Sequence, residues 1–165
     1  MYFRMPSRDW SWDRGDRNKD ELHALAEGDP APGLLAHDGT QAVGWVGLGP
    51  RTSFPRLVRS RKYTALDDRA VWSVVCFFIR KSARGGGVGG RLLEGAIDYA
   101  HEHGAAGLEG YAVDPAERMP DSDAYHGTLS MFERAGFRRA AKAASAAGAQ
   151  DRWIMRLEFE DDAKV

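Results

Sequence analysis

The stretch between Arg84 and Arg91 constrains this chain most, because it reads Arg-Gly-Gly-Gly-Val-Gly-Gly-Arg. Glycine adopts backbone angles denied to other residues and lets the main chain approach a ligand closely. Residues 71–79, before it, are β-branched and aromatic, which predicts a central strand buried on both faces. After it, apolar residues recur at helical spacing as far as Gly104. A glycine turn that opens a helix is suited to phosphate, because free N–H groups and the helix dipole attract anions.

The simplest alternative is a flexible surface turn, but the strand before it and the amphipathic helix after it favour a phosphate site. One phosphate motif can be excluded at once. Gly85 and Gly90 have the spacing of a P-loop, yet Arg91 and Leu92 follow where that motif requires lysine and then serine or threonine.

A dinucleotide-binding turn is the stronger rival. Gly85, Gly87 and Gly90 fit its fingerprint, and either Glu109 or Asp114 lies at about the distance of the ribose-binding acid. Three features oppose it. A basic segment separates strand from glycines, too little chain follows for a doubly wound sheet, and the preceding segment looks like an antiparallel hairpin rather than a strand-helix unit.

A third motif, R-x-x-G-x-G, is formed by Arg84, Gly87 and Gly89. Residues 132–137 read Phe-Glu-Arg-Ala-Gly-Phe and are similar to a Leu-Tyr-x-x-x-Gly-Phe helix ending. Two ordered motifs about forty residues apart are more specific than either alone. In both, the sequence resembles the GCN5-related N-acetyltransferases (GNAT), and the resemblance runs from about Gly33 to the C-terminus.

The resemblance implies an α/β fold: one N-acetyltransferase domain over residues 1–165, with a mostly antiparallel mixed sheet flanked by helices. Two central strands, 71–79 and 107–113, would splay apart and admit the pantetheine arm of acetyl-CoA. Residues 70–104 would form the strand-turn-helix that binds the pyrophosphate, and residues 1–32 a segment on the acceptor side. A homodimer is expected only by this analogy.

The resemblance also assigns coenzyme contacts. Backbone groups of the first strand would meet the pantetheine and the acetyl carbonyl, and amides of the turn would hold the pyrophosphate. The residues concerned are Phe77, Phe78, Ile79, Arg84, Gly85, Gly86, Gly87, Val88, Gly89 and Gly90.

The implied reaction is direct attack of a neutral primary amine on the thioester, so a group must remove the amine's proton. Glu109 is the first candidate base, and a carboxylate that only makes a salt bridge is an equal alternative; Asp114 is a reserve. The tyrosine that commonly protonates the leaving thiolate is replaced by Phe132, which cannot donate. Tyr125 is the candidate substitute, and a plain surface tyrosine is the alternative.

The rest of the chain is expected to alternate helices and strands. A helix is predicted over 18–27, a hairpin over 33–37 and 42–47 around Asp38-Gly39, and a loop or short helix over 50–68. A short helix capped by Ser130 or Thr128 precedes Gly136, and strands follow over 137–143 and 152–159. This pattern predicts a mixed sheet with helices on it.

Composition limits the partners. The 165 residues are 43% hydrophobic and 28% charged, as in a globular protein, and 23 Lys plus Arg nearly balance 24 Asp plus Glu. We therefore expect neither nucleic acid nor membrane as partner. The start lacks a secretory signal, so we expect a cytoplasmic protein. Cys76 is the only cysteine and the histidines are scattered, so no metal site is predicted.

Two further features have open interpretations. Trp10 and Trp12 either line an acceptor pocket or pack the N-terminal segment onto the core. A basic stretch either is a solvated loop or meets an acceptor carboxylate or the 3′-phosphate of coenzyme A; its members are Arg51, Arg56, Arg59, Arg61 and Lys62. Three functions are compared: an N-acetyltransferase for a small amine, a non-catalytic acyl-CoA sensor, and a nicotinamide-dependent oxidoreductase.

Overall fold

The computed structural model describes residues 2–5, 15–114, 125–144 and 151–160. These form a six-stranded mixed sheet in the order β1-β2-β3-β4-β6-β5. Only β3 and β4 run parallel, and every other pair is antiparallel. The strands are β1 (Gly33–Asp38), β2 (Gln41–Pro50), β3 (Trp72–Ile79), β4 (Gly107–Val113), β5 (Arg138–Lys142) and β6 (Arg152–Glu158). This confirms the expected mixed, mostly antiparallel α/β fold.

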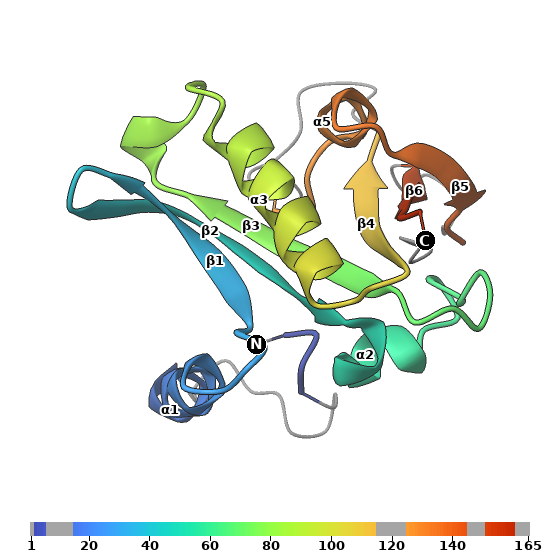
Figure 1. The fold of residues 1–165 in the computed structure, drawn as a ribbon, viewed down its shortest axis with the longest axis horizontal. Coiled ribbons are helices and arrows are strands. Elements are labelled where there is room, and N and C mark those ends of the chain that lie inside the picture. The colour runs from blue at the N-terminus through green and yellow to red at the C-terminus, as the bar shows by residue number, and fades with distance from the viewer. Residues whose placement is uncertain (1, 6–14, 115–124, 145–150, 161–165) are drawn as a thin grey trace, which may run out of the picture.

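Helices lie on both sides of the sheet (Figure 1). Their bounds are α1 (Gly15–Ala26), α2 (Pro55–Val58), α3 (Val88–Glu102) and α5 (Leu129–Arg134), with short 3-10 helices η1 (Arg51–Ser53) and η2 (Lys81–Ala83). Helices α3 and α5 cover one face, whereas α1 has no buried residue and stands off the sheet.

Two apolar clusters occupy the two faces of the sheet. On the α3 face, Leu93 and Ala96 pack with Val74 of β3 and Leu108 of β4. On the opposite face, Tyr111 of β4 packs with residues of the N-terminal segment, of α2 and of the loop after it, namely Phe3, Leu57 and Tyr63. Because side chains alternate along a strand, one sheet supplies both cores.

The first hairpin forms one residue later than predicted. Asp38 pairs with Gln41, so the two-residue turn is Gly39-Thr40 rather than Asp38-Gly39. Glycine suits the first turn position because its φ is +59° there. At α5, the cap is Thr128 and not Ser130, because the Thr128 Oγ1 accepts a hydrogen bond of 3.3 Å from the Met131 amide.

The prediction that residues 71–79 are buried on both faces is wrong at the strand's end. Trp72 to Val75 are buried, but the Phe78 side chain is 63% exposed. The reason is that β4 pairs with β3 only as far as Val74 and Gly110, so the second half of β3 lies beside no strand on that edge.

Within the described parts of the chain, none of the helices has the length and apolarity needed to cross a membrane. Over the same residues, no three histidine, cysteine, aspartate or glutamate side chains come close enough to hold a metal ion. Trp10 and Trp12 lie outside the described residues, so their predicted packing is not addressed.

Candidate functional site

The glycine turn leads from η2 into α3 and leaves the helix start without a side-chain cap. Gly85 and Gly87 have φ angles of +79° and +77°, in the left-handed region that favours glycine. Gly87 is the N-cap residue, and it has no side chain that could bond the first amides of the helix. Because these amides and the helix dipole favour negative charge, the turn can hold an anion.

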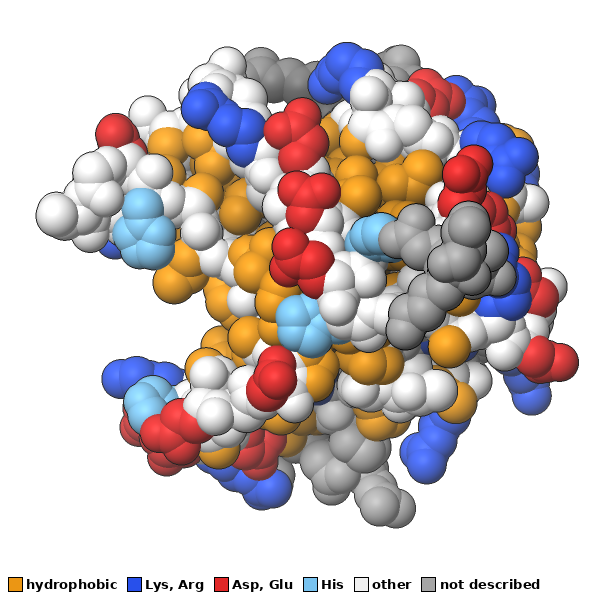
Figure 2. Space-filling view, in the orientation of Figure 1, with side chains coloured by type: hydrophobic (Ala, Val, Ile, Leu, Met, Phe, Trp, Pro, Cys, Tyr) orange, Lys and Arg blue, Asp and Glu red, His pale blue; other side chains and the backbone are white. Residues whose placement is uncertain are grey.

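Two arginines are fixed beside the turn. Arg84 Nε donates to the Ile79 carbonyl at 3.2 Å, and Arg91 Nη2 donates to the Gly86 carbonyl at 2.9 Å. Further along α3 the exposed charges are acidic, at Glu94 and every fourth residue after it, and Figure 2 shows acidic side chains in a line on this face. Positive charge is therefore concentrated at the turn itself.

The strands β3 and β4 separate just beyond Val74 and Gly110, and we call the space between their separated halves the split. Only three residue pairs join the two strands, from Trp72↔Leu108 to Val74↔Gly110. A bulge accompanies the separation, because β2 advances from Leu48 to Gly47 while β3 passes from Val74 to Cys76. Bulges turn a strand away from its neighbour.

The bulge interrupts the alternation of side chains between the two faces of β3. Val75 and Cys76 both pack toward the cluster opposite α3, and Phe77 returns to the α3 face. Burial raises the pKa of the Cys76 thiol, which agrees with its predicted role as a small hydrophobic residue rather than a nucleophile.

The chain segment entering α5 lies in the split. The Phe77 amide donates to the Tyr125 carbonyl at 2.7 Å, and the Val113 amide donates to the Gly127 carbonyl at 3.2 Å. Thus the strand edges exposed by the separation are bonded by residues 125–127.

Phe132 closes the α3 side of the split. Its side chain is fully buried, and its ring contacts Phe77 with centroids 6.3 Å apart. A Cβ atom at Gly110 would lie 2.2 Å from that ring, so β4 requires glycine there. Gly89 is also packed, though less tightly, because a Cβ would meet Ile79 and Met131, each at 3.3 Å. The start of α3, the end of β3 and α5 therefore meet at the split.

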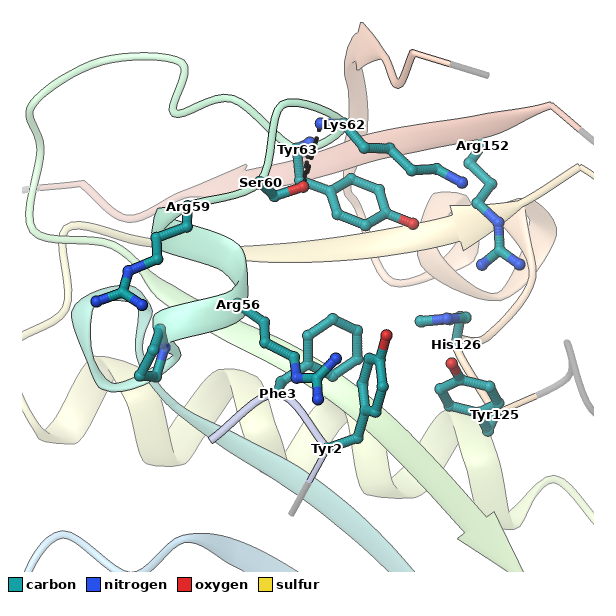
Figure 3. A pocket seen from close by; sticks show the side chains of 11 residues that line it. Tyr2, Phe3, Arg56, Arg59, Ser60, Lys62, Tyr63, Tyr125, His126 and Arg152 are labelled. Carbon is teal, nitrogen blue, oxygen red and sulfur yellow. Dashed lines mark hydrogen bonds between the residues drawn. The ribbon is translucent and has the colours of Figure 1, made fainter. Parts of the chain in front are cut away.

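On the opposite face lies a cavity of about 520 Å³ that we call the basic pocket (Figure 3). Its basic side chains are Arg56, Arg59, Lys62 and Arg152. Its rings are Tyr2, Phe3, Tyr63, Tyr125 and His126. Tyr125 belongs to both the pocket and the split, so the two sites adjoin. Burial, followed by the charges of Arg152 and Lys62, lowers the pKa of His126 to about 3.

Contacts to the N-terminal segment shape the pocket wall. Arg4 Nη2 donates to the Leu48 carbonyl of β2 at 2.7 Å, and Arg56 Nε donates to the Met5 carbonyl at 3.0 Å. The Arg56 guanidinium also lies 3.9 Å from the centre of the Tyr2 ring.

Glu109 lies outside the basic pocket, in a buried network of charges. Its side chain is 2% exposed, and its carboxylate oxygens lie 3.3 Å from Arg156 Nη1 and 3.4 Å from Arg51 Nε. The Tyr111 hydroxyl donates to it at 3.3 Å and lies 2.9 Å from Ser73 Oγ. Burial raises the pKa of Glu109, while the two arginines act in the opposite direction.

A model of the Acetyltransferase (GNAT) family matches residues 1–119. The chain belongs to the GNAT family of acetyltransferases. No curated protein matches this GNAT sequence.

Solved structures share the GNAT fold at low sequence identity. One is yncA from Salmonella typhimurium with its cofactor acetyl-CoA: TM-score 0.60, 15% identity, 89% of this chain and 75% of that chain covered. Another is ribosomal-protein-alanine N-acetyltransferase from Brucella melitensis, with a TM-score of 0.59 and 18% identity. The match covers 87% of this chain and 78% of that chain. A third is a chain of the NatC complex bound to Gag peptide and CoA, with a TM-score of 0.59 and 14% identity. The match covers 96% of this chain and 89% of that chain.

Sequence reasoning missed part of the site of this GNAT protein. It placed Arg56, Arg59 and Lys62 in a basic stretch that either is a solvated loop or meets an acceptor carboxylate or the 3′-phosphate of coenzyme A. It did not connect Arg152 or His126 with them. Hydropathy and spacing gave no signal for this, because the residues come from distant segments that only the folded sheet brings together.

Proposed function

We propose that this GNAT protein transfers an acetyl group from acetyl-CoA to a primary amine of a small molecule. The main supporting observation is the uncapped start of α3, with its left-handed glycines, beside the split between β3 and β4. Acetyl-CoA supplies an activated acetyl thioester. By analogy with the family, we expect the enzyme to be cytoplasmic and to assemble as a homodimer.

The residues fit such a coenzyme. Amides from Gly85 to Gly90 would hold the pyrophosphate, because their helix start has no side-chain cap. The backbone from Phe77 to Ile79 would pair with the pantetheine arm, and an N–H group there would stabilise negative charge on the acetyl oxygen. Since the Phe77 amide is bonded to Tyr125, this pairing requires residues 125–127 to shift.

For proton transfer, we assign Tyr125 the acid role expected of it, because its ring lines the basic pocket and its carbonyl lies in the split. We assign Glu109 a positioning role in preference to that of base. Its carboxylate lies within 3.4 Å of two guanidinium groups and does not line the basic pocket, so it is placed to hold Arg51 and Arg156.

The test is a ligand comparison followed by an activity assay. Acetyl-CoA at 100 times its dissociation constant should add about 2.7 kcal/mol to the free energy of unfolding, whereas NAD and NADP should add nothing. Release of free thiol with a panel of primary amines then measures transfer. Stabilisation by NAD(P) and not by acetyl-CoA would favour an oxidoreductase and contradict the proposal.

A second candidate is an acyl-CoA sensor without catalysis. Two observations favour it: Phe132 cannot donate a proton, and the Phe77 amide is already bonded within the chain. It predicts tight acetyl-CoA binding with no thiol release above the uncatalysed rate for any amine. Peptide N-termini belong in the same amine panel, since two of the similar structures are named for protein or peptide ligands.

A further inference from the structure

A second cavity, of about 520 Å³, adjoins the basic pocket, and we call it the apolar pocket. Its apolar side chains include Phe3, Leu22, Pro32, Trp45 and Val75. None of the described residues that line it is acidic, and Arg4 is the only basic one among them. A cavity of this size, lined mainly by apolar and aromatic side chains, is typical of a site for a small molecule.

Arg4 belongs to the wall of the apolar pocket. Its Nη2 atom donates to the Pro32 carbonyl at 3.1 Å and to the Leu48 carbonyl at 2.7 Å. The guanidinium also lies 4.6 Å from the centre of the Phe54 ring, which is fully buried. Arg4 therefore ties the N-terminal segment to the sheet, and the apolar side chains set the chemistry of the cavity.

The bulged part of the sheet is the floor of the apolar pocket. Gly47 of β2 pairs with Cys76 of β3 at the point where the register shifts. A Cβ atom at Gly47 would lie 2.9 Å from Cys76 Sγ and 3.4 Å from Trp45 Nε1. Glycine therefore allows the thiol and the indole to pack down onto β2, where both line the cavity.

The apolar pocket adjoins the split. Val75 and Cys76 line it, and they are the first residues of β3 beyond the last pair that this strand makes with β4. Tyr125, whose carbonyl accepts from the Phe77 amide in the split, lines it as well. The described residues of the basic pocket, in contrast, include none from β3. Of these two cavities, the apolar pocket is therefore nearer to the strand at which we expect the acetyl group.

Helix α1 forms the outer wall of the apolar pocket. It has no buried residue and stands apart from the sheet in Figure 1. Leu22 of this helix lines the apolar pocket, and Leu25, which is 39% exposed, lines a neighbouring cavity. Surface helices usually bury their apolar side chains against a core. A ligand between Leu22 and Trp45 would therefore bury apolar surface that the described residues leave partly exposed.

We propose that the acceptor is a primary amine on an uncharged apolar body, alkyl or aryl, and that Leu22, Trp45 and Val75 bind this body while the amine points into the split. The inference rests on the proposed function for the fate of the amine, but the apolar pocket stands on its own geometry. It disfavours amines with a second charge at the far end, such as polyamines. Such a charge would lose its hydration in a cavity whose described lining holds no carboxylate.

The experiment compares hexylamine with two analogues that carry a second charge, 1,6-diaminohexane and 6-aminohexanoate. Binding is measured by calorimetry in the presence of coenzyme A, and transfer by thiol release with acetyl-CoA. We expect hexylamine to bind roughly 10- to 100-fold more tightly than either analogue, because neither has to desolvate its second charge in water. From butylamine to hexylamine, each added methylene should tighten binding about fourfold, as the burial of one methylene group does.

The variant Leu22→Asp places a carboxylate in the apolar pocket. Leu25→Asp is the matched control, because it makes the same change on the same helix but beside the neighbouring cavity. Leu22→Asp should weaken hexylamine binding and tighten 1,6-diaminohexane binding, each roughly tenfold, and leave the acetyl-CoA dissociation constant unchanged. The control should change none of the three. If Leu22→Asp does not fold, the amine series on the parent protein decides.

Equal or tighter binding of either doubly charged analogue by the parent protein would overturn the proposal, as would a Leu22→Asp variant that binds the amines as Leu25→Asp does. If hexylamine binds selectively but no amine is acetylated, the apolar pocket is supported and the proposed transferase function fails. If amines are acetylated without preference for an apolar body, the transferase function is supported and the apolar pocket fails.

Discussion

The main-chain amide of Phe77 donates a 2.7 Å hydrogen bond to the carbonyl oxygen of Tyr125. This bond joins β3 to the chain segment that lines the basic pocket. If the pantetheine arm pairs with β3, it must replace this bond, so coenzyme binding and the shape of the basic pocket are coupled.

Coenzyme binding should therefore change the surroundings of residues 77 and 125–128. We expect the amide signals of Phe77 and Gly127 to shift on addition of coenzyme A, and the amide of Val46, buried in the α3-face cluster, to shift little. A heteronuclear NMR titration measures this. Saturation with coenzyme A that leaves the Phe77 amide unchanged would contradict the coupling.

Gly87→Ala should weaken acetyl-CoA binding. The φ of +77° would strain alanine by about 1–2 kcal/mol and shift the turn, so we expect roughly a tenfold rise in the dissociation constant or more. Gly95→Ala is the matched control in the same helix, because its Cβ would meet only Leu34, at 3.5 Å. Calorimetric titration of both variants makes the comparison, and equal affinities would speak against a role for the turn.

Gly110→Ala should destabilise the fold. The new Cβ would lie 2.2 Å from the buried Phe132 ring, and overpacking of this kind costs about 1–3 kcal/mol. Urea denaturation gives the change in free energy of unfolding. A variant as stable as the parent would show that Phe132 is not packed over β4 as described.

Much of the fold was predictable from sequence because its signals are local. The glycine turn, the helix to Gly104 and the strand over 107–113 are each defined by neighbouring residues, and the structure has them at nearly the predicted bounds. The bulge at Val75 was not predictable, since it depends on register against β2.

The charged sites depend on contacts between distant segments. Glu109 meets Arg156, which is 47 residues away, and the basic pocket joins segments from residue 2 to residue 152. Sequence reasoning therefore found Glu109 and Tyr125 without showing that they line different cavities.

Glu109→Gln should reduce stability more than catalysis. Removing its charge takes away the buried partner of Arg156, which is 4% exposed and keeps Asp67 and Glu158 as partners, so we expect a cost of about 1–3 kcal/mol. We expect a lower midpoint of urea denaturation, with kcat reduced less than roughly tenfold and an unchanged pH profile. A hundredfold loss of kcat in a folded variant would instead identify Glu109 as the base.

His126 should make the protein less stable in mild acid. The unfolded chain takes up a proton near pH 6.5 and the folded chain only near pH 3, so the unfolded state binds more protons between these values. Stability is then full above about pH 6.5 and falls by up to about 1.4 kcal/mol per pH unit below it. Urea denaturation from pH 7 to pH 5 should show a shallower fall for His126→Gln than for the exposed control His37→Gln; identical slopes would contradict this assignment.

The most direct test of the account is a crystal structure of the protein with coenzyme A. We expect the diphosphate oxygens within about 3.2 Å of the amides between Gly85 and Gly90, as ordinary hydrogen bonds require, and the pantetheine arm in the split. A diphosphate bound anywhere else, with the start of α3 covered by the chain's own side chains, would contradict the account.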